Sequence, residues 1–250
     1  MNQSLPHVPF ATGWYGFGLR GYRPCGGTYE RYSYDTIPPL PYEQFTGQLQ
    51  WLVPLHPDID AQMQDYRFAE EELEEPTPQW AENLKSVMAS AEHLGLRLPE
   101  SFLRLMSSPL LRTRIPSCTD CHFTLSQLAF CPGDKEKGYV LRFLHDQQDC
   151  VIWHLSLSSE SEECVLASHT YLDMVYTASE EFDHITEQEA VAQTWVCAPS
   201  FEAFLYRFWM ENILWFNLHK HKPLTEEQKQ YLAFYGEEQP EENRFLRKKR

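Results

Sequence analysis

The sequence has no long apolar run and no segment of the kind that directs a chain into a membrane. No stretch approaches the roughly 18 consecutive apolar residues that a spanning helix requires. The opening residues, MNQSLPHVPFATGW, have neither a basic region nor an apolar core, so they do not match a secretory signal peptide. We therefore expect a cytoplasmic protein without membrane association.

Basic residues are scarce and unevenly placed. The chain carries 36 Asp and Glu against 21 Lys and Arg, which gives a formal net charge of -15. Five of the 21 basic residues lie in residues 244–250, where there is no acidic residue. Such an acidic body repels phosphate backbones, so the composition argues against direct nucleic-acid binding and favours a basic protein partner.

The short motifs of several enzyme classes are also missing. Glycines are frequent between Gly13 and Gly27, but no Gly-Lys-Ser/Thr follows them, so no phosphate loop is predicted. There is no nucleophile elbow, and no Cys, His and Asp set stands out by its spacing. We expect a protein that is not an enzyme and needs no cofactor.

The seven cysteines are an odd number, which in a cytoplasmic chain is typical of reduced and mostly buried thiols. Residues 118–122 (CTDCH) match the haem c attachment pattern, but that attachment normally requires an exported chain. A redox-active pair would favour a helix N-terminus, whereas a strand is predicted here. A weak zinc alternative remains, with the ligands Cys118, Cys121, His122 and Cys131. Structural cysteines at the entry to a strand are favoured, so no metal is expected.

The clearest strand pattern lies between Tyr139 and Ser168. Apolar and polar residues alternate in three runs, and short polar segments separate the runs. Such a pattern predicts an antiparallel meander. The three runs are residues 139–144, 150–155 and 164–167.

Three segments carry helix signals. Thr77 suits the N-cap of a helix whose apolar stripe, Trp80–Leu94, should be buried against the sheet. Ser200 suits the N-cap of a helix that is apolar on more than one face, for which we favour burial over exposure to a partner. Thr225 begins a last helix, with Gln228 at the capping-box position.

These elements predict an α+β fold with an antiparallel or mixed central sheet of about five or six strands, flanked by helices. The expected organisation has three parts. Residues 1–76 form a loop-rich aromatic N-terminal arm and an acidic segment, and residues 77–218 form the α+β domain. Residues 219–250 form a C-terminal helix and a basic tail.

The order of several short motifs resembles the SUKH superfamily, the Smi/Knr-like group. The motifs are residues 98–102 (LPESF), 153–155 (WHL), 164–168 (CVLAS) and 200–205 (SFEAFL). The resemblance covers roughly residues 77–218 and implies an α+β fold. Many bacterial members resemble immunity proteins that bind and neutralise a toxin domain, often a nuclease, and fungal relatives act as regulatory interaction proteins. No catalytic residues are associated with the fold, so none is transferred.

The leading hypothesis is a non-enzymatic protein-binding module of the immunity type, whose acidic body would attract a basic toxin domain. The alternatives are an intracellular regulatory scaffold of the same fold and a metal-binding protein using Cys118, Cys121 and His122. The candidate partner-binding residues share a position in acidic segments, where a solubilising surface charge is the simpler explanation. They are Glu160, Glu162, Glu163, Asp183, Glu71 and Glu72.

Overall fold

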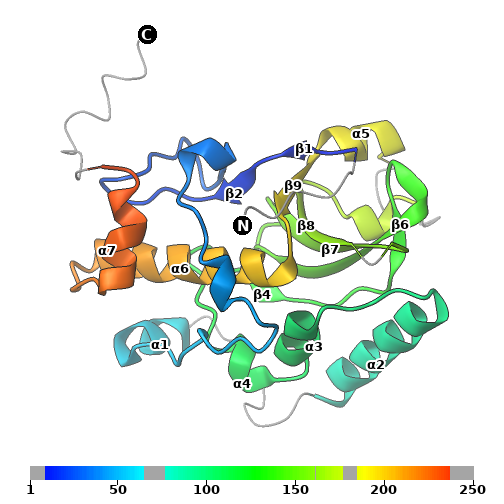
Figure 1. The fold of residues 1–250 in the computed structure, drawn as a ribbon, viewed down its shortest axis with the longest axis horizontal. Helices are drawn as coiled ribbons and strands as arrows, with labels where there is room; N and C mark the ends of the chain where they lie inside the picture. Colours follow the sequence, from blue (N-terminus) through cyan, green and yellow to red (C-terminus); the bar gives the residue numbers. More distant parts are fainter. Residues whose placement is uncertain (1–8, 65–76, 161, 177–184, 237–250) are drawn as a thin grey trace.

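The computed structural model describes residues 9–64, 77–160, 162–176 and 185–236 of the chain. Figure 1 shows a central sheet with helices on both sides. The strands are β1 (Ala11–Thr12), β2 (Trp14–Gly16), β3 (Glu30–Tyr32), β4 (His122–Phe123), β5 (Ala129–Cys131), β6 (Asp134–His145), β7 (Ile152–Ser158), β8 (Glu163–Ser168) and β9 (Thr194–Ala198). The helices are α1 (Pro57–Gln64), α2 (Pro78–His93), α3 (Glu100–Met106), α4 (Pro109–Arg112), α5 (Glu187–Ala192), α6 (Phe201–His219) and α7 (Glu226–Ala233), with the short 3-10 turns η1 (Tyr34–Thr36), η2 (Tyr42–Gln44) and η3 (Leu172–Met174).

The main sheet has the strand order β1-β9-β8-β7-β6-β4, and β5 also pairs with β6. Only the β1–β9 pair is parallel among the pairs in the described residues, so the sheet is mixed. A smaller sheet pairs β2 with β3. The predicted α+β class with a mixed sheet is therefore confirmed.

The meander predicted between residues 139 and 168 is confirmed as β6, β7 and β8. Its antiparallel register places Leu141 opposite Leu155, and Leu155 opposite Val165. Because directly opposed residues point to the same face of a sheet, these side chains form one apolar row. All three are completely buried.

Alternation along the strands produces two cores, one on each face of the sheet. The larger core packs residues such as Trp153 and Leu155 against α6. The smaller core contains Val140, Leu166 and Ala190, the last of which comes from α5. The larger core draws buried residues from positions between Trp14 and Leu232, and so from all three of the expected chain segments.

Helix α6 is the central helix of the larger core. Ser200 caps it, because its hydroxyl oxygen accepts a hydrogen bond from the Ala203 backbone N–H at 3.2 Å. Phe204 contacts both Phe143 and Trp153 with its ring, at centroid distances of 5.4 and 5.9 Å. The favoured burial of this helix is confirmed, since most of its residues are inaccessible to solvent.

A buried ion pair joins the N-terminal segment to α6. Arg23 donates to both carboxylate oxygens of Glu211 at 2.6 Å, and Trp14 Nε1 donates to Oε2 of Glu211 at 2.8 Å. Tyr231 of α7 also donates to Glu211, at 2.7 Å. Although burial opposes ionisation, the Arg23 guanidinium holds the pKa of the Glu211 carboxyl below its usual range.

Within the described part of the chain, no helix combines the length and the apolar character that a membrane crossing needs. Even α6 contains charged residues, including the buried Arg207 and Glu211. Its burial is explained by the fold itself, because the sheet, the N-terminal segment and α7 contribute residues to the same core.

Candidate functional site

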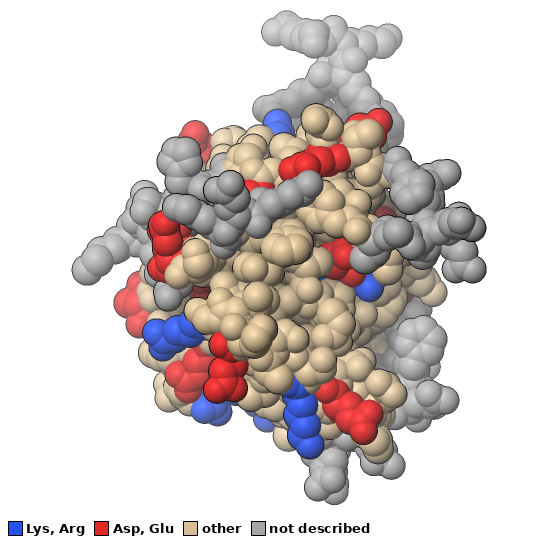
Figure 2. Space-filling view, turned by 90° about the vertical axis from the view of Figure 1, so that its right-hand side faces the viewer, with Lys and Arg blue, Asp and Glu red and all other residues tan. Residues whose placement is uncertain are grey.

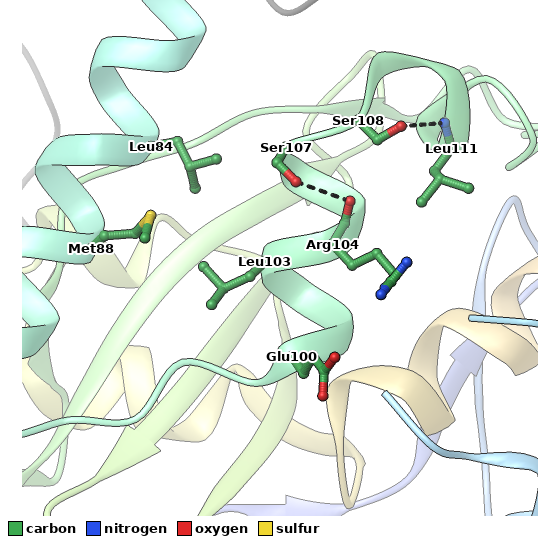
Figure 3. Close-up of a pocket in the computed structure, with 8 residues that line it drawn as sticks. All are labelled: Leu84, Met88, Glu100, Leu103, Arg104, Ser107, Ser108 and Leu111. Atoms are coloured by element: carbon green, nitrogen blue, oxygen red, sulfur yellow. Dashed lines mark hydrogen bonds between the residues drawn. The ribbon is translucent and has the colours of Figure 1, made fainter. Parts of the chain in front are cut away.

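An open groove of about 470 Å³ lies where α2 meets α3 and α4. We call it the α2–α3 groove, and Figure 3 shows its lining residues around a shared space. Four of its eight lining residues are apolar and four are polar or charged. The lining residues are Leu84, Met88, Glu100, Leu103, Arg104, Ser107, Ser108 and Leu111.

Helix α2 forms one wall because its caps and one aromatic anchor fix its position. The Thr77 hydroxyl accepts from the Trp80 N–H at 3.3 Å, and the Trp80 indole donates to the Met106 carbonyl at 2.7 Å. Only part of the predicted apolar stripe is buried. Leu84 faces the core, whereas Met88 remains 45% exposed beside the groove. The prediction that the whole stripe is buried was therefore wrong, because α3 and α4 leave this part of α2 uncovered.

Helices α3 and α4 form the opposite wall. The Ser108 hydroxyl caps α4 by accepting from the Leu111 N–H at 3.3 Å, and Leu111 lines the groove. Gln48 lies between Glu100 and Arg104 and hydrogen-bonds to both side chains. The charges of the groove are thus held in place, while its exposed apolar surface lies at Met88.

A row of carboxylates lies beside the Glu100 end of the groove. A Cβ added to Gly47 would lie 3.3 Å from a Glu100 carboxylate oxygen, and the Gly47 N–H donates to Glu202 at 2.7 Å. Glu202 is close enough to Glu163 that its charge helps to raise the pKa of Glu163. We call Glu100, Glu202 and Glu163 the carboxylate row.

The acidic loop between β7 and β8 lies at the far end of this row. The Ser158 hydroxyl accepts from the backbone N–H groups of Glu160 and Glu162, at 3.3 and 3.2 Å, which fixes the turn. Both of these glutamates are exposed.

Glu163 differs from its two neighbours because its side chain is half-buried at the start of α6. Burial raises the pKa of its carboxyl to about 7, although the Phe201 N–H and Arg97 oppose the rise. One of its oxygens has no hydrogen-bond partner. Glu163 therefore belongs to the interior of the loop base, and any contact with a partner would come first from Glu160 and Glu162.

The other candidate partner-binding residues, Glu71, Glu72 and Asp183, lie outside the described residues. Their role stays a prediction. On the side of the molecule shown in Figure 2, charged side chains lie around an uncharged middle and are not gathered into one acidic patch. The acidic composition alone therefore does not mark a binding surface on this side.

The residues of the zinc alternative point to different surroundings. Cys118 and Cys121 pack against the larger core, and Cys131 is buried in the smaller one. Burial raises the pKa of the Cys121 thiol to about 11 and that of Cys131 to about 12, which disfavours the thiolate that a metal requires. Among the residues that the structure describes, no set of three potential ligands gathers around one point. His122 instead pairs across β4 and β6 with His145.

Comparison of the chain with protein-family models, with curated proteins and with solved structures finds no match. Its groove, the neighbouring carboxylates and the resemblance described from the sequence are therefore the features that bear on its function. Sequence reasoning did not find the groove. Met88 belongs to a continuous helical stripe, so its exposure depends on how α3 lies against α2.

Proposed function

We propose that this protein is a non-enzymatic protein-binding module and that the α2–α3 groove receives its partner. We further propose that the partner is a basic toxin domain, which the module neutralises as an immunity protein. The observation that carries the proposal is the open groove, half of whose lining residues are apolar, with the exposed Met88 among them.

The shape and lining of the groove suit one kind of protein segment. An aliphatic floor between helices is typical of sites that receive the apolar face of a partner helix. Leu84, Leu103 and Leu111 supply apolar lining of this kind, and Ser107 and Ser108 add polar groups. Burying Met88 would remove apolar surface from water, which favours association.

The surrounding charges suit a basic partner. Glu100 lies in the groove, and the exposed Glu160 and Glu162 lie in the acidic loop beyond the buried Glu202 and the half-buried Glu163. A helix that places apolar residues in the groove and Lys or Arg side chains toward Glu100 would meet complementary charge. Such complementarity raises the rate of encounter and adds specificity.

A matched pair of substitutions tests the groove. Met88→Asp puts a charge on α2 where the partner should bury an apolar side chain, and Phe234→Asp puts the same charge at the end of α7, which lies on the opposite side of the molecule from α2 in Figure 1. The two positions are equally exposed, at 45% and 46%. We expect Met88→Asp to weaken the complex at least about tenfold, and Phe234→Asp to leave it nearly unchanged.

The partner for this test is the product of a toxin-domain gene beside the gene for this protein. Co-expression should restore the growth that the toxin prevents, and Met88→Asp should abolish the rescue. If no toxin-domain gene lies there, the regulatory scaffold becomes the better hypothesis. If the toxin forms no complex even at low salt, the immunity function is wrong.

A further inference from the structure

Helix α3 presents two opposite charges to the α2–α3 groove. Glu100 and Arg104 both line the groove, and both side chains are exposed. They are four residues apart on the helix, so about one turn, or about 6 Å along the helix axis, separates them. The groove therefore offers a partner an acid and a base at the spacing of a helical turn.

The side chain of Gln48 lies between these two charges and bonds to both. Its amide N–H donates to Glu100, and its amide oxygen accepts from Arg104. Opposite charges four residues apart on a helix commonly pair with each other directly, whereas here Gln48 bridges them. A carboxylate accepts several hydrogen bonds and a guanidinium has five N–H donors, so each group keeps the capacity to bind a partner as well.

The backbone around Gln48 is anchored to α6, so this bridge is part of the fold. The Gly47 N–H donates to Glu202 at 2.7 Å, and the Trp51 indole donates to the same carboxylate at 2.9 Å. Leu49, which follows Gln48 in the chain, is only 3% exposed. The two charges of the groove are thus held before a partner arrives, which lowers the entropic cost of binding.

The apolar lining and the charges lie on different sides of α3. In Figure 3, Leu103 points toward Met88 of α2, whereas Arg104 lies on the opposite side of α3. A partner helix that lies along α3 would therefore turn apolar residues toward Met88 and polar residues toward Glu100 and Arg104. Such a helix is amphipathic, with its charges along one flank of the apolar stripe.

We propose that the groove recognises an amphipathic helix that carries one basic and one acidic residue a single turn apart. This inference rests on the proposed function and specifies the chemistry of the partner segment. The basic residue pairs with Glu100 and the acidic residue pairs with Arg104, while Gln48 is a positioning residue for both. A flank with only basic residues would bring one of them against Arg104, and such like-charge contacts oppose binding.

The order of the two charges in the partner depends on the direction of its helix. In a helix antiparallel to α3, the acidic residue precedes the basic one by four residues. That order also stabilises the partner helix itself, because Glu four residues before Lys is the better arrangement within a helix. An antiparallel helix further brings its C-terminal end, which favours cations, toward Glu100. We therefore expect the antiparallel orientation.

Three synthetic amphipathic helical peptides of about 20 residues test the proposal. They share one apolar stripe and differ only in the charge pair, which is Glu before Arg, Arg with Arg, or Glu with Glu. Fluorescence anisotropy measures their binding to the full chain at about 50 mM NaCl. We expect the unaltered protein to bind the mixed peptide at least about fivefold more tightly than either of the others. Arg104→Glu should instead prefer the Arg–Arg peptide, and Glu100→Arg should prefer the Glu–Glu peptide.

Helix α7 supplies matched controls, because it carries the exposed pair Glu226 and Lys229. Glu226→Arg and Lys229→Glu make the same changes of charge on another helix and should keep the preference of the unaltered protein. Gln48→Ala should reduce the preference for the mixed peptide. A loss of stability alone would not do so, because it would weaken the binding of all three peptides alike.

Equal binding of the three peptides by the unaltered protein, or no binding of any, would overturn the proposal. So would an Arg104→Glu variant that still prefers the mixed peptide. The proposed function has its own test in the toxin and Met88→Asp, so the two failures differ. Toxin binding that Met88→Asp weakens, without any preference among the peptides, refutes this inference alone. A clear preference among the peptides, with no toxin complex, refutes the immunity function alone.

Discussion

Replacing Glu163 by glutamine should stabilise the protein above neutral pH. Burial raises the pKa of the Glu163 carboxyl from 4.5 to about 7, and the neighbouring Glu202 adds to the rise. The folded state therefore holds a proton that the unfolded state releases between these two values. Stability falls as the pH rises through this window, because ionisation then costs more in the folded state.

The size of the effect follows from the difference between the two pKa values. Each unit corresponds to about 1.4 kcal/mol, so Glu163 should lower the free energy of unfolding by about 2–3 kcal/mol between about pH 5 and about pH 8. A glutamine can still accept the hydrogen bond of the Phe201 N–H but cannot ionise. If the glutamine amide also changes the free energy of unfolding for a reason other than ionisation, that change does not depend on pH. It therefore cancels when the difference between the two proteins at about pH 5 is compared with the difference at about pH 8.

Urea unfolding of both proteins at about pH 5, 6, 7 and 8 measures this difference. We expect the stability of Glu163→Gln relative to the unaltered chain to rise with pH by about 2–3 kcal/mol. A relative stability that stays constant across this range would refute the assignment of a buried, high-pKa carboxyl at Glu163. A relative stability that falls with pH would reverse the sign and refute it as well.

Three further changes have defined outcomes. Glu160→Lys with Glu162→Lys should weaken the toxin complex more at about 50 mM than at about 500 mM NaCl, as binding measured at both salt concentrations would show. Glu211→Gln should lower the free energy of urea unfolding by about 3–5 kcal/mol, because it leaves the charge of Arg23 buried and unpaired. Thr225→Ala should lower the free energy of urea unfolding by about 1 kcal/mol, because its hydroxyl caps α7.

The first two of these changes have matched controls. Asp35→Lys with Glu226→Lys makes the same change of net charge at exposed positions away from the acidic loop, and an equal loss of affinity would remove the loop from the interface. Lys222→Gln breaks an exposed ion pair with Asp58 and should cost less than about 1 kcal/mol. If Glu211→Gln lowers the free energy of unfolding no more than Lys222→Gln does, the Arg23–Glu211 pair does not behave as a buried ion pair.

Local patterns in the sequence were sufficient for the elements that depend on neighbouring residues. The Thr225 and Gln228 capping box forms as predicted, and so does the three-stranded meander. Strand β9 was missed, because residues 194–198 form a short run whose partners, β8 and β1, lie far away in the chain. Pairing between such distant segments leaves no periodic signal.

The candidate site was harder to predict for the same reason. Glu163 is one of three glutamates in an acidic loop, yet only its side chain turns inward, toward the start of α6. Met88 is exposed only because α3 and α4 leave part of α2 uncovered. Composition can indicate an acidic protein with a possible basic partner, but it cannot say which acids or apolar residues face solvent.

Isothermal titration of the neighbouring-gene toxin domain into the unaltered protein, Met88→Asp and Phe234→Asp tests the central claim most directly. We predict a stable complex for the unaltered protein, an affinity at least about tenfold weaker for Met88→Asp, and nearly the original affinity for Phe234→Asp. Equal affinities for the two variants would contradict partner binding at the α2–α3 groove, and no complex with the unaltered protein would contradict the immunity function.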